Sequence, residues 1–457
     1  MKKKLFLILI TMLIGIGVGF SQTEFKTVPG TDPNNENNTR DVAANGLTSL
    51  YSISGNYYLS VDGAGNNSGP YTIDVNKPSP LATVHKAYLM DAVWSYTSAN
   101  GCITLNGNSI NWGGSLLNQA GGTNHWSDVT ALVASVMDPA SPGITSFNIT
   151  ECNYSSNEGT TLLVIFSDPT SPNETIVIMW GNLNSAGDNF AITLGEAIDP
   201  SDPGAKLDMG LGIAYSFQTG SAQNSNIDIN GTRLTSSAGG QDDAPGSTGG
   251  NGQLITIGGI GDVNSNPPDP NHIESSNPRY DDELYSLLPL ITNTTTNILV
   301  ATSNPSYDDN IFVSYFEISG DAIIGEGILL TQTQNTENVN TNHTVTALVQ
   351  DDDGAPVVGT QVDFSILSGP NSGGSFSGNT GPTGHISYTY LGSGGVGTDI
   401  IEACFLDSQT NTQCSNNLSV EWIDGGGPSV PVSDWAIYFA VLLIGIAVWF
   451  RFKTRIA

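Results

Sequence analysis

The chain has 457 residues, in which 43 Asp and Glu oppose 13 Lys and Arg, for a net charge of −30. Six basic residues lie at the two ends, so the span 24–450 holds 7 basic and 43 acidic residues, a charge of −36. Nucleic-acid binding is excluded, because it depends on Lys and Arg that neutralise phosphates. Hydrophobic residues reach 38% and charged residues only 12%, which excludes a disordered chain and is atypical of a helical cytosolic protein.

The first 21 residues have the pattern of a secretory signal peptide. Lysines at 2–4 precede an apolar run at 5–20, and the small residues Gly19 and Ser21 come just before an expected cut at Ser21/Gln22. No Cys stands at the cut, which argues against a lipoprotein. An uncleaved signal anchor is the alternative. In either case the sequence predicts export.

The body of the chain has the pattern of an all-β protein. Residues 22–49 are rich in Asn, Pro and Asp and are expected to form a loose N-terminal arm. From residue 50, short apolar or alternating runs are bounded by Gly, Asn, Pro or Ser, as β-strands are. Two helices are expected, over 127–137 with Ser127 or Asp128 as the cap, and over 281–288.

Two internal echoes indicate a duplication. Ile-Thr-Leu-Asn-Gly-Asn at 103–108 recurs as Ile-Asp-Ile-Asn-Gly-Thr at 227–232, and Asn-Gly between β-forming residues predicts a hairpin. The run at 163–169 is echoed at 299–305. The sequence therefore predicts two related, jelly-roll-like β-sandwich units over 50–195 and 196–320.

This duplicated region resembles a β-rich domain of secreted bacterial surface proteins. The resemblance rests on the strand His-Lys-Ala-Tyr-Leu at 85–89, the helix pattern at 128–133 and Tyr-Asp-Asp-Glu-Leu-Tyr at 280–285, in this order. It implies no activity.

Residues 327–423 carry a second set of motifs. Thr-Val-Thr-Ala-Leu-Val-Gln at 344–350 leads into Asp-Asp-Asp-Gly-Ala-Pro at 351–356, and Gly-Pro-Thr-Gly at 381–384 precedes a closing Val-Glu-Trp at 420–422. These residues resemble the bacterial immunoglobulin-like domain of the invasin and intimin type. The resemblance implies an immunoglobulin-like β-sandwich that serves as a rigid stalk or adhesin module.

The four cysteines fit an oxidising compartment, where an even number favours disulfides. Their spacing favours the pairs Cys102 with Cys152 and Cys404 with Cys414. No CxxC or HxxxH pattern is present to suggest zinc.

The C-terminus has three parts. A Gly/Pro linker at 424–434 is followed by the uncharged apolar run 435–450 and the basic tail 451–457. As a helix the run would span about 24 Å, which can cross a bilayer if its flanks snorkel. The sequence thus predicts a single transmembrane helix with the basic tail in the cytoplasm; a buried soluble helix is the alternative.

This tail resembles the PEP-CTERM and IPTL-CTERM sorting signals of bacterial envelope proteins. The corresponding motif residues are Pro431, Ser433, Asp434 and Trp435, although the literal Pro-Glu-Pro and Ile-Pro-Thr-Leu forms are absent. The resemblance implies processing by an exosortase-like enzyme.

Candidate ligand sites are few. Asp262, Asn264 and Asn266 have the spacing of calcium ligands, but Pro267 stands where an EF-hand needs Gly and Ile273 where it needs Glu. A different calcium site and a plain acidic turn both remain open, and no other cofactor is predicted.

Two further patterns bear on carbohydrate. Acidic clusters at 242–243, 281–283, 308–309 and 351–353 leave open a glycosidase carboxylate pair. Trp94, Trp112, Trp126 and Trp180 fit either a sugar-binding face or a hydrophobic core.

The sequence predicts an exported, envelope-anchored bacterial surface protein with its N-terminal part outside. Its role is predicted to be adhesive or structural rather than enzymatic, with an unidentified glycan or protein ligand. A carbohydrate-binding or carbohydrate-active surface protein is the alternative.

Overall fold

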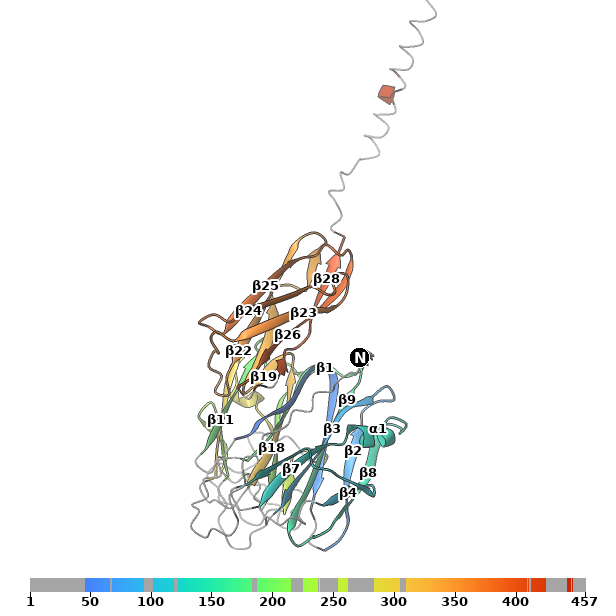
Figure 1. The fold of residues 1–457 in the computed structure, drawn as a ribbon, viewed down its shortest axis with the longest axis vertical. Helices are drawn as coiled ribbons and strands as arrows, with labels where there is room; N and C mark the ends of the chain where they lie inside the picture. The colour runs from blue at the N-terminus through green and yellow to red at the C-terminus, as the bar shows by residue number, and fades with distance from the viewer. Residues whose placement is uncertain are drawn as a thin grey trace, which may run out of the picture. The chain divides into compact units, whose positions relative to one another are not determined.

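The computed structural model describes most of the chain between residues 46 and 424, and its fold is shown in Figure 1. The described residues are 46–65, 68–93, 102–118, 122–182, 187–214, 225–236, 238, 254–261, 283–304, 310–408, 410, 412–424, 442–444 and 446. The predicted signal peptide, most of the N-terminal arm and the basic tail lie outside these residues. Strands dominate the described part of the chain, which confirms the all-β prediction.

The largest sheet has ten strands. In pairing order they are β15 (Ile255–Ile257), β12 (Leu207–Ala214), β18 (Asn310–Ser319), β10 (Asn173–Trp180), β1 (Thr48–Ala64), β9 (Asn157–Ser167), β3 (Thr83–Val93), β7 (Thr123–Asp128) and β6 (Gly114–Leu117), with β16 (Leu284–Ser286) also pairing β12. Strand β1 joins its two halves, because residues 48–56 pair with β10 whereas residues 57–64 pair with β9.

Two smaller sheets cover the halves of this sheet. The first contains β2 (Tyr71–Lys77), β8 (Gly143–Glu151), β4 (Ile103–Leu105) and β5 (Asn108–Ser109). The second contains β14 (Thr232–Thr235), β13 (Asn226–Ile229), β17 (Asn297–Ser303), β11 (Asp188–Leu194) and β19 (Ala322–Ile324).

The strand order is that of a jelly roll, and it occurs twice. If the second half of β1 and then β2, β3, β4, β5, β7, β8 and β9 are numbered one to eight, the sheets run 1-8-3-6 and 2-7-4-5. Strands β10, β11, β12, β13, β14, β16, β17 and β18 repeat this order. By pairing, β10 and β11 belong to the second jelly roll, although they precede residue 196, where the sequence begins the second unit.

The Asn-Gly hairpins occupy equivalent places in the two jelly rolls. Asn106 and Gly107 have φ of 50° and 77°, and Asn230 and Gly231 have φ of 51° and 75°, as a type I′ turn requires. Each Asn side chain also accepts a hydrogen bond from a neighbouring strand of the same sheet. Asn106 accepts from the Asn148 N–H of β8 at 2.8 Å, and Asn230 accepts from the Leu299 N–H of β17 at 2.9 Å. The first echo is therefore a true structural repeat.

The second echo is not a structural repeat. It equates 163–169 with 299–305, but β9 is the eighth strand of its jelly roll and β17 is the seventh of the other. The counterpart of β9 is β18. Both β9 and β17 are apolar β-strands, and that shared composition explains why the two runs look alike.

One predicted helix is confirmed and the other is wrong. Helix α1 (Thr130–Met137) follows β7, but its N-cap is Val129, without a side-chain capping bond, and not Ser127 or Asp128 as predicted. The Asp128 carboxylate accepts a hydrogen bond from the Thr130 N–H at 2.9 Å just before the helix. The described part of 281–288 instead forms strand β16, which leads into the 3-10 helix η2 (Leu288–Leu290). Tyr285 is buried in the core opposite Met209 of β12, so tertiary pairing overrides the local helical preference.

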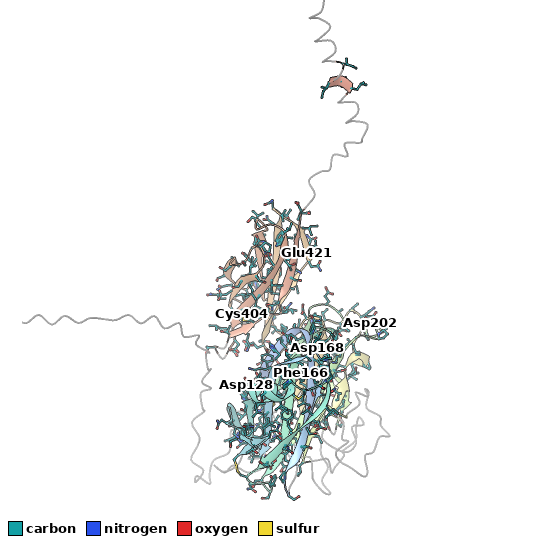
Figure 2. All side chains as sticks on the ribbon, turned by 90° about the vertical axis from the view of Figure 1, so that its right-hand side faces the viewer. Asp128, Phe166, Asp168, Asp202, Cys404 and Glu421 are labelled. Atoms are coloured by element: carbon teal, nitrogen blue, oxygen red, sulfur yellow. A yellow bond between two sulfur atoms is a disulfide. The ribbon has the colours of Figure 1, made fainter. Side chains whose placement is uncertain are left out.

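Three hydrophobic clusters hold the jelly rolls together. One lies inside each jelly roll, and the cluster inside the first jelly roll contains Phe166, which is labelled in Figure 2. The third joins side chains from both halves of the large sheet, such as Ile165 of β9, Ile178 of β10 and Phe312 of β18. Both faces of these strands are therefore buried, which accounts for uninterrupted apolar runs such as 162–166 and 176–180.

A buried pair of amides also links the two jelly rolls. The Asn124 side chain of β7 donates to Asn310 Oδ1 at 3.1 Å, and the Asn310 side chain donates back to Asn124 Oδ1 at 2.7 Å. Because each amide satisfies the other away from water, the pair favours one register between the two halves.

Residues 327–423 form a separate β-sandwich. One sheet contains β20 (Gly327–Gln332), β22 (Asn342–Gln350) and β25 (His385–Leu391). The other contains β21 (Thr336–Asn338), β28 (Leu418–Ile423), β26 (Gly397–Leu406), β23 (Gln361–Ser368) and β24 (Ser375–Asn379), with β27 (Thr412–Cys414) pairing β26. If β20, β22, β23, β24, β25, β26 and β28 are labelled A to G, the pairings A-B-E and C-F-G are those of an immunoglobulin-like sandwich.

This immunoglobulin-like sandwich is connected to the second jelly roll through β19 and β20. Strand β19 pairs with β11, and only two residues separate it from β20. The Thr193 hydroxyl of β11 donates to Gln350 Oε1 at 2.5 Å, and Gln350 Nε2 donates to the Gly325 carbonyl at 3.0 Å. Gln350 is 1% exposed, so these bonds are shielded from water.

Candidate functional site

Several residues singled out in the sequence lie outside the described residues. They are Asp262, Asn264, Asn266, Trp94, the acidic positions 242–243, 281–282 and 308–309, and the motif residues Pro431, Ser433, Asp434 and Trp435. Of the predicted membrane run, positions 442–444 and 446 are described, and they are helical. Within the described ranges, no helix has the length and apolar character needed to cross a membrane.

Both predicted disulfides are present. Cys102 pairs with Cys152 at a Cα–Cα distance of 5.6 Å, and Cys404, labelled in Figure 2, pairs with Cys414 at 4.1 Å. Glu402, Cys404 and Cys414 lie close together, but the two sulfur atoms are bonded to each other, so this group offers no thiolate to a metal.

The described aromatic and acidic candidates are engaged in packing or in turns. Trp180 is 7% exposed, and Trp126 packs edge-on against it. Trp112 stacks on His125. Asp351 accepts hydrogen bonds from the backbone of Asp353 and Ala355, so it closes a turn. These described residues therefore form neither a flat aromatic platform nor a carboxylate pair.

An open groove of about 700 Å³ lies beside the second jelly roll. Its lining includes Asp199 and Asp202. Asp199 accepts hydrogen bonds from Ser201, and Asp202 accepts one from the Gly204 N–H, so both carboxylates are used within their own turns.

A cluster of carboxyl groups inside the first jelly roll stands out from these features. We call it the Asp91 cluster, and it consists of Asp91 near the end of β3, Glu151 at the end of β8, and Asn157 and Glu158 at the start of β9. Asp91 is fully buried, and Asn157 is 5% exposed. The Tyr71 hydroxyl donates to Glu151 Oε1 at 2.5 Å and contacts Thr160 Oγ1 at 3.1 Å.

Four oxygen atoms of the Asp91 cluster are buried without a hydrogen-bond partner in the described chain. They are both carboxylate oxygens of Asp91, Glu151 Oε2 and Asn157 Oδ1. Buried polar atoms in proteins are nearly always paired, because an unpaired one costs about 1–3 kcal/mol. Four such acceptors from three neighbouring strand ends therefore need an explanation.

The electrostatics of the Asp91 cluster are as unusual as its hydrogen bonding. Burial, reinforced by the charge of Glu151, raises the pKa of Asp91 well above its ordinary value, although the Asn157 side chain and the Ala92 backbone act in the opposite direction. Burial also raises the pKa of Glu151 to about 7, and burial together with Glu151 raises the pKa of Glu158 to about 7. The charged neighbours that act on these carboxyls are themselves carboxyls.

The second jelly roll handles buried acids differently. There the Lys206 ammonium lies 3.3 Å from Glu174 Oε2 and 2.8 Å from Glu317 Oε1. Although burial acts to lower it, these two carboxylates raise the pKa of Lys206. One jelly roll thus neutralises its buried carboxylates with a lysine, whereas the other has no such group among the described neighbours of Asp91.

Sequence reasoning missed the Asp91 cluster. The available signal was a single Asp in the otherwise apolar run Ala-Tyr-Leu-Met-Asp-Ala-Val at 87–93. Its partners come from residues 151–158, and no spacing rule relates these positions before the strand pairing is known.

The immunoglobulin-like sandwich has a buried polar anchor of its own. Asp399 is fully buried, and it accepts hydrogen bonds from Trp422 Nε1 at 2.6 Å, from the Tyr390 hydroxyl at 3.1 Å, and from the backbone and side chain of Asn371 at 2.9 and 2.7 Å. Every acceptor of this carboxylate is engaged, so Asp399 stabilises the fold and is not a binding site.

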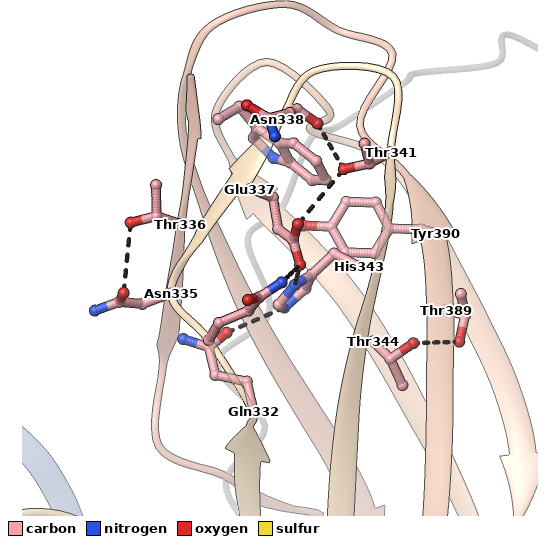
Figure 3. A network of polar contacts seen from close by, with 12 residues as sticks. Gln332, Asn335, Thr336, Glu337, Asn338, Thr341, His343, Thr344, Thr389 and Tyr390 are labelled. Carbon is pink, nitrogen blue, oxygen red and sulfur yellow. Dashed lines mark hydrogen bonds and ion pairs between the residues drawn. The ribbon is translucent and has the colours of Figure 1, made fainter. Parts of the chain in front are cut away.

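Figure 3 shows the polar network beside this anchor. His343 contacts Gln332 Oε1 at 3.1 Å and Glu337 Oε1 at 3.4 Å. Thr341 donates to the Asn338 carbonyl at 2.7 Å. The network ties β21 to β22 and closes one end of the sandwich.

Comparison with known proteins identifies no family. No family model matches the chain, and no curated protein matches it. Among solved structures, a tetra-tandem repeat from the extending region of a large adhesion protein aligns with 81% of this chain and 75% of its own, at 11% identity and a TM-score of 0.18.

Two other solved structures give similar values. A β-1,2-glucanase from Parabacteroides distasonis aligns with 56% of this chain and 33% of its own, at 11% identity and a TM-score of 0.14. The pilus backbone of Streptococcus pneumoniae aligns with 80% of this chain and 93% of its own, at 8% identity and a TM-score of 0.14. TM-scores of this size carry no argument about fold or function.

Proposed function

We propose that this chain is an exported, envelope-anchored bacterial surface protein with an adhesive or structural, non-enzymatic role. In this proposal the immunoglobulin-like sandwich is a stalk of the invasin and intimin type, and it displays the tandem jelly rolls. The C-terminal helix inserts in the membrane, and an exosortase-like enzyme recognises the tail.

The observation that carries the proposal is the connection between the second jelly roll and the immunoglobulin-like sandwich. A stalk transmits force and orientation only if it is coupled stiffly to what it carries. Strand β19 completes a sheet of the jelly roll and continues after two residues into β20, and Gln350 bonds across the connection. The Ala191 N–H also donates to the Asp352 carbonyl at 3.1 Å.

Two properties of the sequence support the surface location. The predicted ectodomain carries 7 basic against 43 acidic residues, which favours solubility and mutual repulsion at a cell surface. Its two disulfides require an oxidising compartment to persist.

Location and role can be tested separately. On intact producing cells, an added protease should remove the jelly rolls and leave a cytoplasmic control protein uncut; protection of the chain until lysis would contradict surface display. The fragment 22–428 should then bind a glycan, host protein or neighbouring cell in array and cell-binding assays. If it binds none of these, and deletion of the chain leaves attachment and envelope integrity unchanged, the adhesive or structural role is refuted.

A further inference from the structure

We propose that the Asp91 cluster is a buried binding site for a hard divalent cation, Ca²⁺, held by oxygen atoms of Asp91, Glu151 and Asn157. The proposed ligands are different residues from Asp262, Asn264 and Asn266, which lie outside the described residues, and the proposal does not depend on an adhesive role.

The first step of the argument is the chemistry of the atoms. Both Asp91 oxygens, Glu151 Oε2 and Asn157 Oδ1 are acceptors, and each is buried and unpaired in the described chain. Carboxylate and amide oxygens are the ligands that Ca²⁺ takes, in shells of six to eight. Zinc sites in proteins are built mainly on sulfur and nitrogen ligands, with carboxylate oxygen as an addition. The cross-strand neighbour of Asp91 on β7 is His125, and its Nδ1 is already bonded to Ser115 Oγ at 2.7 Å.

The second step is the charge. Asp91, Glu151 and Glu158 place up to three negative charges at one end of the first jelly roll. A buried charge is stable only when it is paired or coordinates a metal, and otherwise the group stays protonated. In the second jelly roll, Lys206 supplies the pairing for Glu174 and Glu317. A divalent cation would fill the same role beside Asp91.

The third step is preorganisation. Glu151 directly precedes Cys152, and the Cys152 N–H donates to the Cys102 carbonyl at 3.1 Å beside their disulfide. Tyr71 holds the other Glu151 oxygen at 2.5 Å. Asp91, near the end of β3, is held by strand pairing on both sides, opposite Thr160 of β9 and His125 of β7. The ligands therefore come from rigid strands and not from one flexible loop.

The test uses the full-length chain, stripped with a chelator and titrated with Ca²⁺, Mg²⁺ or Tb³⁺. Ca²⁺ should raise the thermal midpoint of the wild type by several degrees, and Mg²⁺ should do so at least tenfold less effectively. Tb³⁺ should give sensitised luminescence, because Tyr71 lies against the ligand Glu151. Competition with Ca²⁺ should abolish this signal.

Asp91→Asn and Glu151→Gln should each weaken Ca²⁺ and Tb³⁺ binding at least tenfold. Asp208→Asn is the matched control, because Asp208 is also buried, at 6% exposure, on the equivalent strand β12, but its neighbours Glu174 and Glu317 are paired with Lys206. It should leave binding unchanged. In chelator, Asp91→Asn should be at least as stable as the wild type, which separates loss of the site from failure to fold.

Three results would overturn the proposal. The first is that Ca²⁺ has no effect on the wild type, which would mean that the carboxyl groups of the cluster are simply protonated. The second is that the response to Ca²⁺ survives in Asp91→Asn and disappears in Asp262→Asn, which would place the ion at the sequence motif. The third is that Mg²⁺ binds as tightly as Ca²⁺, which would contradict the assignment of the metal.

Discussion

At the scale of single residues, buried acids decide the stability of both kinds of domain. Asp399 accepts four hydrogen bonds inside the immunoglobulin-like sandwich. Asp399→Ala would leave the hydrogen-bond donors of Trp422, Tyr390 and Asn371 without an acceptor in a dry core. We expect a loss of about 3–5 kcal/mol in the free energy of unfolding of this sandwich, measured by urea denaturation.

The control for this prediction is Asp363→Ala. Asp363 lies on β23 with its side chain exposed, where it accepts a hydrogen bond from Gln361 at 2.9 Å. We expect this change to stay within about 0.5 kcal/mol. Equal effects of the two substitutions would show that Asp399 does not anchor the fold.

His343 gives the same sandwich a dependence on pH. Burial lowers the pKa of His343, although Glu337 and Asp399 act in the opposite direction. Tyr390 and Trp422 pack edge-on against the ring, and Gln332 bonds its Nε2. Because the folded state disfavours the protonated ring, the unfolded chain binds more protons as the pH falls through about 6.5.

We therefore expect the thermal midpoint of the immunoglobulin-like sandwich to fall between about pH 7 and about pH 5. His343→Gln should flatten this slope, whereas His385→Gln at an exposed position should leave it intact. Calorimetry across that pH range measures the difference. A slope that persists in His343→Gln would assign the effect to another group.

Residue-level prediction from sequence succeeded where the signal was local. The cysteine pairs followed from spacing, and the Asn-Gly turns from backbone preference. Asp91, Asp399 and Gln350 could not be assigned, because each is a polar residue in an ordinary strand pattern. Their importance comes from residues brought beside them by pairing over long sequence distances.

At the scale of elements, glycines show which strands and turns tolerate a side chain. Gly107 has φ of 77° and open space around its missing Cβ, so Gly107→Ala should cost only about 1 kcal/mol of backbone strain. Gly210 of β12 has no such room, because its Cβ would overlap the ring of buried Tyr315. Gly210→Ala should cost about 3 kcal/mol or more.

The measurement is the urea midpoint of each variant, with Gly69→Ala as the reference. Gly69 also has open space, but its φ lies outside the range where side chains are strained, so the change should be neutral or slightly stabilising. If Gly210→Ala were as mild as Gly107→Ala, the packing of β12 against β18 described above would be wrong.

Element prediction failed where a long-range partner competed with a local preference. Residues 284–286 look like part of a helix in isolation, but β12 offers them a strand partner and the core takes Tyr285. Likewise, the echo between β9 and β17 follows composition and not position. Existence of β-structure was predictable, whereas the choice of partner strand was not.

At the scale of the whole molecule, the connection through Gln350 should make the second jelly roll and the immunoglobulin-like sandwich unfold together. Gln350→Ala removes one of the two side-chain partners of Thr193, the other being Asn297, and removes the donor to the Gly325 carbonyl, at a cost of about 1–3 kcal/mol. We expect calorimetry to resolve an additional, separate transition in this variant.

Gln361→Ala is the control, because Gln361 is exposed on β23, away from the connection. It should leave the number of transitions unchanged. If the wild type itself already melts in separate steps for these two parts, the coupling assumed for a stalk is absent.

The sharing of β1 between the two jelly rolls has a consequence for the order of events during synthesis. A chain made from its N-terminus presents β1 first, yet Thr48 pairs with Trp180 and Tyr57 pairs with Ser167. The first inner sheet needs β9, which ends at Ser167, and the second needs β18, which ends at Ser319, so β1 must wait as an unpaired strand. Pairing across such distances is slow, and a waiting edge is prone to aggregate. A factor that shields this strand until its partners are made should therefore raise the yield of folded protein.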